Sequence, residues 1–303
     1  MGNPKFAIRP LKSLLVSNHD IVAVISNPPK KMGRKNLFKH TDVGQYALDN
    51  NLNLIELSDF NDSETYKNIA SLNVDLFVVV AFRILPPKYI ELPKFGSVNI
   101  HASMLPKYRG AAPIQWSLMN GDRTTGVSVF QIERKVDSGQ IIYQEKISID
   151  NDDNFESLST KLSKLGSKAL IKSLKLLANN DFELKAQDNL KSTKAPKIKK
   201  WMLRIDWSWK GNKINNWVRG LSPYPCMYTI CNGKKYKIFK TRVMNHTSEL
   251  SPGKIEIVNL KKLVVHSADS AISVLELQQE GKKRLLIKEF LKGSNIKNGD
   301  YFS

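Results

Sequence analysis

Short runs of aliphatic and β-branched residues alternate with helical patterns through the first half of the chain, and this alternation constrains the fold most. The runs typical of strands lie at 21–26, 52–57, 74–82, 97–101, 126–132 and 141–149. Helical patterns occupy 4–16, 43–50 and 63–72, and a long helix is expected at 155–177. Strands that alternate with helices indicate βαβ units, so we predict a doubly wound, Rossmann-like parallel sheet of the α/β class.

A polar, Lys-rich stretch at 181–203 follows and is interpreted as a linker. Beyond it, turn signals such as Asn232-Gly233 and Glu280-Gly281 divide a series of short strand patterns. These patterns lie at 228–231, 235–241, 253–258, 263–266 and 273–278. A series of short strands predicts a small, OB-like β-barrel. We therefore expect an α/β domain at 1–180, the linker at 181–203 and the barrel domain at 204–303.

The charge is strongly positive and unevenly distributed. The chain has 47 Lys and Arg against 28 Asp and Glu, a net charge of +19. Residues 191–303 carry 23 basic and 8 acidic residues, whereas residues 1–190 carry 24 and 20. A basic C-terminal third favours RNA or DNA as a partner ahead of a membrane surface. AT-rich codon usage would also enrich lysine, so the charge alone leaves both explanations open.

Several classes of protein are excluded by composition and spacing. No apolar run approaches the roughly 18–20 residues of a membrane span. The two cysteines, Cys226 and Cys231, and the five scattered histidines show no metal-ligand spacing, so neither a disulfide framework nor a zinc site is predicted. We expect a globular, cytoplasmic protein without a metal.

Three polar residues stand where strands of the predicted sheet end. Asn99 and His101 lie two residues apart on the run 97–101, so they share one face of a strand. Asp137 follows the next run, and open α/β sheets bind ligands at such strand ends. Together they can serve acyl transfer without a nucleophilic Ser or Cys, because the carboxylate orients the imidazole while imidazole and amide stabilise an oxyanion. Each residue alone is also common in a structural role, so this pattern leaves the site open.

These residues belong to longer motifs. The segments 99–106 (NIHASMLP), 108–113 (YRGAAP) and 137–139 (DSG) closely resemble the 10-formyltetrahydrofolate-dependent formyltransferases. Within that superfamily the chain is most similar to the branch that formylates methionyl-tRNA, because RIDW at 204–207 follows the linker and the barrel is basic. The resemblance covers essentially the whole chain. It implies 10-formyltetrahydrofolate as cosubstrate, the initiator methionyl-tRNA as partner, and no metal.

The resemblance also implies roles for individual residues. Asn99, His101 and Asp137 are the expected catalytic residues. The residues expected to line the folate site are Ser103, Met104, Leu105 and Pro106. A basic loop at 30–35 implies contacts of Arg34 and Lys35 with the tRNA acceptor stem. On the barrel, the candidate phosphate contacts are Lys234, Lys235, Lys237, Lys240, Lys282, Lys283 and Arg284.

Two features depart from the family pattern. The family begins with a strand that ends in a Gly-x-Pro-x-Phe turn, whereas this chain begins inside that turn, with MGNPKF at 1–6. The first strand of the sheet is therefore expected to be missing, which would leave neighbouring strands without ladder partners. Our hypothesis is that the start lies upstream, and an in-frame stop codon directly before Met1 would contradict it. In addition, Arg83 stands where the family has a glycine beside the pteridine, so the shape of that pocket is expected to differ.

Two other functions remain as alternatives. A sugar-nucleotide N-formyltransferase shares the catalytic set, and it has no need of a strongly cationic barrel. The second alternative is a non-catalytic RNA-binding protein that keeps the fold of the enzyme without its activity. The missing first strand keeps this alternative open. For the preferred function we expect a monomer that binds neither membrane nor DNA.

Overall fold

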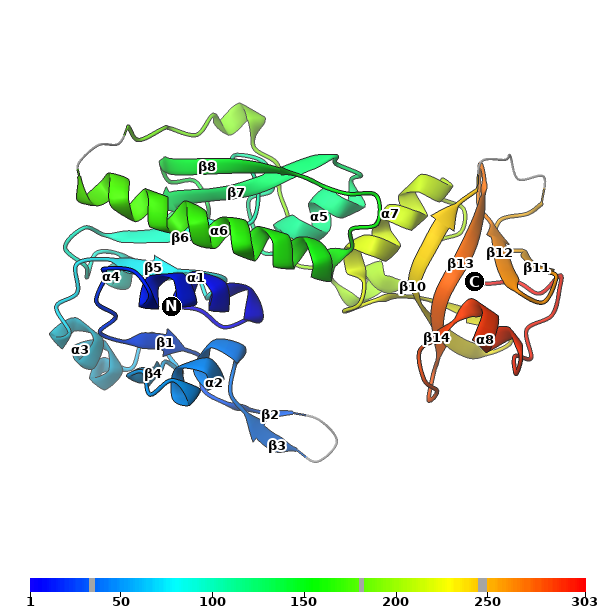
Figure 1. Cartoon of the computed structure of the whole chain (residues 1–303), viewed down its shortest axis with the longest axis horizontal. Coiled ribbons are helices and arrows are strands. Elements are labelled where there is room, and N and C mark those ends of the chain that lie inside the picture. The colour runs from blue at the N-terminus through cyan, green and yellow to red at the C-terminus, as the bar shows by residue number, and fades with distance from the viewer. Residues whose placement is uncertain (33–35, 180–182, 245–249) are drawn as a thin grey trace. The chain divides into compact units, whose positions relative to one another are not determined.

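The computed structural model describes residues 1–32, 36–179, 183–244 and 250–303 (Figure 1). The chain forms two compact units. Unit 1 comprises Met1–Pro113, Thr124–Ile147 and Ser159–Ala195, and unit 2 comprises Ile114–Arg123, Ser148–Leu158 and Pro196–Ser303. The boundary at Ala195–Pro196 lies within the stretch interpreted as a linker. Among the helices of the described ranges, none is both long and apolar enough to cross a membrane.

Unit 1 is built from strands and helices that follow the predicted alternation. Its main strands are β1 (Val24–Ser26), β4 (Leu54–Glu56), β5 (Phe77–Val79), β6 (Ser97–His101), β7 (Thr124–Gln131) and β8 (Ile141–Ser148). Its helices are α1 (Ile8–Leu15), α2 (Asp42–Asp49), α3 (Ser63–Ser71), α4 (Pro87–Ile90) and most of α6 (Phe155–Ala178), whereas α5 (Pro113–Met119) belongs to unit 2 from Ile114 on. Parallel pairing joins β1 to β4 and β5 to β6, which confirms the predicted α/β class. The sheet is not wholly parallel as expected, because β7 runs antiparallel to β6.

Local sequence explains where two of these helices begin. The Thr41 hydroxyl accepts a hydrogen bond from the Gly44 N–H at 2.9 Å and caps α2. The Asp62 carboxylate accepts from the N–H groups of Glu64 and Thr65 and caps α3. These side chains satisfy amide groups that the first helical turn leaves without partners.

The first two residues lie in the middle of the sheet. The Gly2 N–H donates to Ile25 O of β1 at 3.0 Å, and the Val80 N–H after β5 donates to Met1 O at 2.9 Å. The amino group of Met1 donates to Val78 O at 2.7 Å, and burial lowers its pKa to about 5. A cavity of about 340 Å³ with largely apolar walls extends beside them, along β1 and β5. Met1 and Gly2 thus join two sheets that do not otherwise pair within the described ranges, and the hypothesis of an upstream start stays a prediction.

A hairpin projects from unit 1 after β1. It consists of β2 (Lys30–Met32) and β3 (Leu37–Lys39), which pair antiparallel. Arg34 and Lys35, predicted to contact the acceptor stem, lie outside the described residues. Leu37 and Phe38 are both more than half exposed on this hairpin.

Unit 2 holds an antiparallel sheet in the order β11-β12-β13-β10-β9, with β14 beside β13. Its elements are α7 (Gly211–Leu221), β9 (Met227–Cys231), β10 (Lys234–Val243), β11 (Ile255–Val258), β12 (Lys262–His266), β13 (Ala271–Gln279), β14 (Leu285–Leu286) and α8 (Ile287–Leu291). The predicted C-terminal β domain is therefore confirmed. The helix α7 was not predicted, because its apolar face of Ile214, Val218 and Leu221 is interrupted by asparagine and glycine, which disfavour helices.

The last residues of the chain connect the two edge strands of this sheet. On the β9 side, Ile230 and Ser303 exchange two backbone hydrogen bonds of 2.9 Å. On the β11 side, the Phe302 N–H donates to Gly253 O at 2.8 Å, and the Ile255 N–H donates to Asp300 O at 2.8 Å. Both edges thereby gain partners, and the sheet closes in the manner of a barrel.

Candidate active site

The strand β6 positions Asn99 and His101 in unit 1. Val79 of parallel β5 lies opposite Asn99, and Ser128 of antiparallel β7 lies opposite His101, so β6 is hydrogen-bonded on both sides. The alternation of a strand directs both side chains to one face. His101 is buried, and its ring packs edge-on against Phe130 with the centroids 6.4 Å apart.

The imidazole of His101 has a partner at each nitrogen. Its Nε2 lies 2.8 Å from Tyr108 O, and because a carbonyl oxygen only accepts, Nε2 must carry a proton. Its Nδ1 lies 3.6 Å from the Asp137 carboxylate, and both side chains are nearly buried, with 6% and 11% of their surface exposed. The Nε2 proton is thus engaged by a main-chain carbonyl, and Nδ1 faces the Asp137 carboxylate. The site therefore holds a buried imidazole oriented beside a carboxylate.

Asp137 accepts hydrogen bonds from two residues, Gly110 and Gln187. Its Oδ2 accepts a hydrogen bond from the Gly110 N–H at 2.8 Å, and its carbonyl accepts one from Gln187 Nε2 at 3.0 Å. Gln187 Nε2 also donates to Gly139 O at 2.7 Å. Arg109 in turn donates from Nε and Nη2 to Gln187 Oε1, at 3.0 and 2.7 Å. Gln187 therefore fixes the turn that carries Asp137.

Residues of the predicted linker pair with the loop that follows β6. The Arg109 N–H donates to Thr193 O at 2.9 Å, and the Ala195 N–H donates back to Arg109 O at 2.7 Å. Thr193 Oγ1 also accepts from the Tyr108 N–H at 2.8 Å. The segment up to Ala195 thus forms part of the site. Sequence reasoning missed Gln187 because nothing distinguishes one glutamine in a polar stretch.

Asn99 keeps its amide available for a ligand. Its buried Oδ1 atom has no hydrogen-bond partner among the described residues. Buried polar atoms are nearly always hydrogen-bonded, and exceptions gather at functional sites. The Asn99 Oδ1 atom is therefore not used by the fold, and Asn99 lies two residues before His101 on the same strand.

The four residues predicted to line the folate site fall into two groups. Ser103 and Leu105 are buried, and the Ser103 hydroxyl donates to Lys107 O at 2.6 Å. Met104 and Pro106 are only partly buried, so their side chains can contact a ligand. Ser103 and Leu105 thus shape the loop, and the role of all four in folate binding stays a prediction.

Arg83 connects the ends of two parallel strands. Its Nη1 and Nη2 donate to Ser58 O and Leu57 O, at 2.8 and 2.5 Å, just after β4. Its guanidinium lies over the Phe60 ring, 4.4 Å from the centroid. The Arg83 side chain therefore ties the loop after β5 to the end of β4.

Gly139 lies in the turn that carries Asp137, and its replacement tests whether this turn positions the carboxylate. A Cβ atom at this position would lie 1.8 Å from Gln131 O, a backbone atom that cannot move away easily. We expect Gly139→Ala to lower the free energy of unfolding by about 1–3 kcal/mol, as overpacking typically does. The added methyl group would also displace Asp137. A displacement of about 1 Å of a catalytic group typically lowers activity by about 10²-fold, and we expect a loss of this size.

Thermal denaturation followed by circular dichroism measures the first effect, and initial rates measure the second. Gly293→Ala is the matched control, because a Cβ there meets nothing within 4 Å. Equal stability and activity of the two variants would show that the Gly139 turn does not position Asp137.

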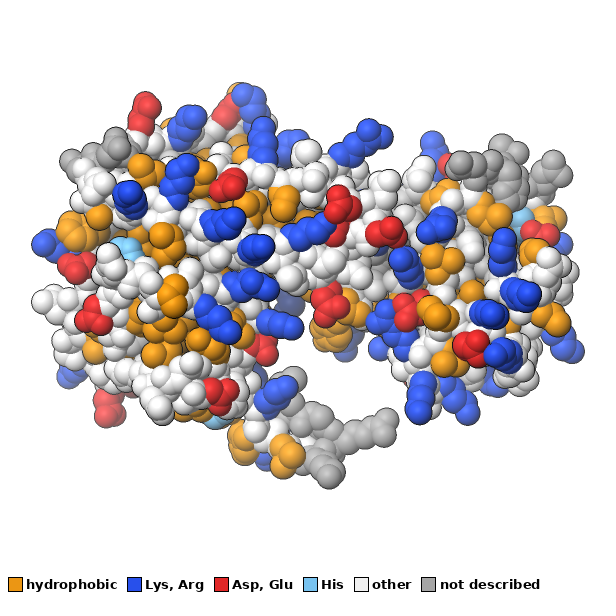
Figure 2. Space-filling model, viewed as in Figure 1, with side chains coloured by type: hydrophobic (Ala, Val, Ile, Leu, Met, Phe, Trp, Pro, Cys, Tyr) orange, Lys and Arg blue, Asp and Glu red, His pale blue; other side chains and the backbone are white. Residues whose placement is uncertain are grey.

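Four of the seven predicted phosphate contacts of unit 2 gather at one end of its sheet. Lys234 and Lys235 follow the β9–β10 turn, and Lys282 and Lys283 follow the end of β13. The two turns are adjacent, because the Glu280 N–H donates to Lys235 O at 2.9 Å. Figure 2 shows many Lys and Arg side chains over the face of this unit. We call Lys234, Lys235, Lys282 and Lys283 the lysine cluster.

Three other candidates are placed differently. Arg284 donates from Nε and Nη2 to both carboxylate oxygens of Glu276 at 2.6 Å, so its donors are largely engaged. Lys240 pairs with Asp152 at 3.2 Å, whereas Lys237 is exposed on β10. Within the described ranges, no three His, Cys, Asp or Glu side chains are grouped so as to hold a metal ion.

The chain is similar to known proteins along its whole length. Residues 1–174 match the formyl transferase family, and residues 197–295 match the formyl transferase C-terminal domain. The methionyl-tRNA formyltransferase of Thermodesulfovibrio yellowstonii is 38% identical over 304 residues, covering 100% of this chain and 97% of the relative. That of Caldanaerobacter subterraneus subsp. tengcongensis is 36% identical over 301 residues, covering 99% and 97%.

Solved structures share the fold. A sugar 3N-formyl transferase, WlaRD, determined with dTDP and 5-N-formyl-THF, aligns with a TM-score of 0.67 and 22% identity over 93% of this chain and 97% of that one. An N-formyltransferase from Helicobacter canadensis, in complex with folinic acid and dTDP-3-aminofucose, aligns with a TM-score of 0.66 and 22% identity over 90% and 96%. At this identity the likeness concerns the fold alone.

Proposed function

The chain belongs to the formyl transferase family, and from that membership we propose that it transfers the formyl group of 10-formyltetrahydrofolate to the α-amino group of initiator methionyl-tRNA. The product, N-formylmethionyl-tRNA, serves translation initiation. The observation that carries this proposal is the match of both units to methionyl-tRNA formyltransferases, which extends over 99–100% of the chain.

The geometry of the site supports this chemistry. The acceptor is an α-amine, whose pKa of about 8 leaves a neutral, nucleophilic fraction near pH 7. When the amine attacks the formyl carbon, negative charge develops on the formyl oxygen. Asn99 carries an amide NH2 group that can donate a hydrogen bond to this oxygen, and His101 offers an imidazole that is held between Tyr108 O and Asp137 and polarised by the carboxylate. These groups stabilise the developing charge.

Asp137 is suited to the proton transfers. Its Oδ2 faces His101 and accepts from the Gly110 N–H. We propose that this carboxylate, through a water molecule, takes the proton of the attacking amine and helps to return one to N10 of the leaving tetrahydrofolate. In this arrangement His101 acts electrostatically, as an imidazole polarised by Asp137, since its Nε2 proton is already bound by Tyr108 O.

Acceptor identity tests the proposal against its main alternative. The purified protein is supplied with 10-formyltetrahydrofolate and, in separate reactions, with methionyl-tRNA or with a dTDP-linked amino sugar. We expect formylation of methionyl-tRNA at a much higher kcat/KM. A preference for the amino sugar would favour the sugar-nucleotide function, and transfer to neither acceptor would favour a non-catalytic RNA-binding protein.

Salt dependence tests the tRNA contact. If the four lysines of the lysine cluster each neutralise one phosphate, the slope of log affinity against log salt is about −3.6, so a fourfold rise in salt weakens binding by about 10²-fold. We expect Lys234→Ala to reduce the magnitude of this slope by about 1. Filter binding at several salt concentrations measures both values.

Lys292 provides the control for this measurement. It is exposed in unit 2, but its ammonium group pairs with Glu289 at 2.8 Å. We expect Lys292→Ala to leave the slope unchanged. A slope near zero for the unmodified protein would mean that the lysine cluster does not bind tRNA.

We further propose a cytoplasmic location and a monomer in solution, without membrane or DNA partners. A translation-initiation substrate supports the location. Light scattering measures the oligomeric state, and a stable dimer at micromolar concentration would contradict the monomer.

A further inference from the structure

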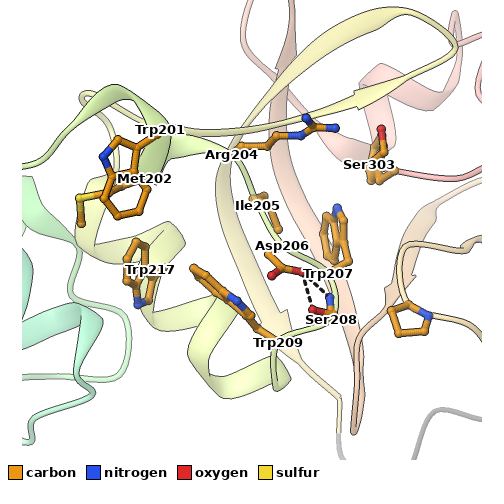
Figure 3. A pocket seen from close by; sticks show the side chains of 12 residues that line it. Trp201, Met202, Arg204, Ile205, Asp206, Trp207, Ser208, Trp209, Trp217 and Ser303 are labelled. Carbon is orange, nitrogen blue, oxygen red and sulfur yellow. Dashed lines mark hydrogen bonds between the residues drawn. The ribbon is translucent and has the colours of Figure 1, made fainter.

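A pocket lined by tryptophan lies within unit 2, apart from the candidate active site. Its volume is about 530 Å³, and three of its walls are the rings of Trp201, Trp209 and Trp217 (Figure 3). Trp209 and Trp217 meet edge to face, with their centroids 4.8 Å apart. Trp201 is 74% exposed, which is unusual for so large an apolar side chain. The aromatic surface is therefore available to a ligand.

The polar groups of the pocket include an oriented carboxylate. Asp206 Oδ1 accepts hydrogen bonds from the Ser208 N–H at 3.0 Å and the Ser208 hydroxyl at 2.6 Å, as drawn in Figure 3. Its Oδ2 has no partner within the described part of the chain. This oxygen can accept a hydrogen bond from a ligand.

The surroundings of the pocket are cationic. Residues 196–213 contain six basic side chains and one acidic side chain, Asp206. Arg204 lines the pocket, is exposed and has no acidic partner among the residues that the structure places. Lys213 Nζ lies 3.7 Å above the Trp209 ring. The pocket thus combines aromatic walls, a single acceptor and a basic rim.

We propose that this pocket binds one unpaired nucleobase of the RNA substrate, and specifically a base with an exocyclic amino group. The base stacks on the tryptophan rings, its amino group donates to Asp206 Oδ2, and Arg204 contacts the adjacent phosphate. Unstacked RNA bases are recognised in this way, by aromatic stacking and by hydrogen bonds to base edges. The inference rests on the proposed function, because the RNA is the tRNA substrate.

Two other ligands fit the pocket less well. A free phosphate would gain from Arg204, but it would be repelled by Asp206 and would leave the tryptophan rings uncovered. An apolar peptide would cover the rings, but it would leave the Asp206 acceptor unsatisfied and would gain nothing from the basic rim. A nucleotide uses all three kinds of group.

Mononucleotides test the ligand class directly. All five tryptophans of the chain lie in unit 2. Four of them, Trp201, Trp207, Trp209 and Trp217, line this pocket, so tryptophan fluorescence reports ligand binding there. We expect AMP, CMP and GMP to quench this fluorescence with saturation. UMP, which lacks an exocyclic amino group, should bind several-fold more weakly, and ribose 5-phosphate should not bind. Equal binding of ribose 5-phosphate and AMP would overturn the proposal in favour of an anion site.

Variants test whether the pocket serves tRNA binding. We expect Trp201→Ala to weaken tRNA binding by about tenfold, as loss of one stacked base does, and Trp201→Phe to restore most of it. Asp206→Asn should abolish the preference of the pocket for AMP over UMP. Tyr224→Ala is the matched control, because Tyr224 is an aromatic residue of unit 2 that is 78% exposed and does not line the pocket.

The outcomes separate this inference from the proposed function. If the unmodified protein formylates methionyl-tRNA but Trp201→Ala and Tyr224→Ala bind tRNA alike, the nucleobase pocket is wrong and the function stands. If the protein binds AMP in this pocket but formylates no methionyl-tRNA, the proposed function fails and the nucleotide site stands.

Discussion

Replacing His101 with alanine is expected to lower kcat for formyl transfer by about 10²–10³-fold, the loss typical of one well-placed oxyanion-stabilising group. His101 supplies an imidazole that is buried on β6 and held between Tyr108 O and the Asp137 carboxylate. Its removal leaves the developing oxyanion with Asn99 alone, and it leaves the nearly buried Asp137 carboxylate without the imidazole, although the Gly110 N–H still donates to it. Asn99→Ala should cause a loss of similar size. Initial rates at saturating concentrations of both substrates measure these effects.

His19→Ala serves as the control for this experiment, because His19 is exposed and remote in sequence from the site. Circular dichroism establishes that each variant is folded before its rate is compared. Near-normal turnover of His101→Ala in a folded protein would remove His101 from the catalytic machinery.

Phe302→Ala is expected to lower the free energy of unfolding of unit 2 by about 3–5 kcal/mol, the usual range for a buried phenylalanine. Phe302 is 3% exposed, and its ring stacks on Trp207 with the centroids 5.9 Å apart. It also contacts Tyr236, and its backbone links the end of the chain to Gly253. The substitution therefore loosens the segment that closes the sheet, in addition to opening a cavity.

Urea denaturation followed by tryptophan fluorescence measures this effect, because every tryptophan lies in unit 2. Tyr301→Ala is the matched control, since its side chain is 50% exposed although it is the next residue in the chain. If both variants lose the same small amount of stability, the closing segment contributes little to the stability of the sheet.

Strands with strong apolar patterns could be predicted closely from the sequence. The strand 97–101 has its predicted bounds, and the helix predicted at 63–72 is Ser63–Ser71. Antiparallel pairing of β7 could not be predicted, because a buried strand has the same composition in either direction. The closing of the barrel also has no sequence signal, since it is made by backbone hydrogen bonds of the last four residues.

The residues of the candidate site can likewise be divided into those that the sequence predicts and those that it does not. The structure puts His101 and Asp137 3.6 Å apart, as their grouping in the sequence analysis implied. The reason differs, because antiparallel β7 ends opposite Val98 and not opposite His101, so the turn after β7 brings Asp137 to the imidazole. Tyr108 could not be identified, because it acts through its carbonyl, which every residue has. Gln187 lies 50 residues from Asp137 in sequence, within a stretch whose polar composition indicates only a linker. Partners supplied by the main chain and by distant polar segments become visible only when the chain is folded.

A single-turnover reaction tests the central claim most directly. The protein, in excess, is mixed with 10-formyltetrahydrofolate and methionyl-tRNA, and the N-formylmethionine released by alkaline hydrolysis is compared with the tetrahydrofolate formed. We expect equal amounts of the two products from the unmodified protein, and a large loss of both with His101→Ala. Tetrahydrofolate without N-formylmethionine, or neither product from the folded, unmodified protein, would contradict the claim.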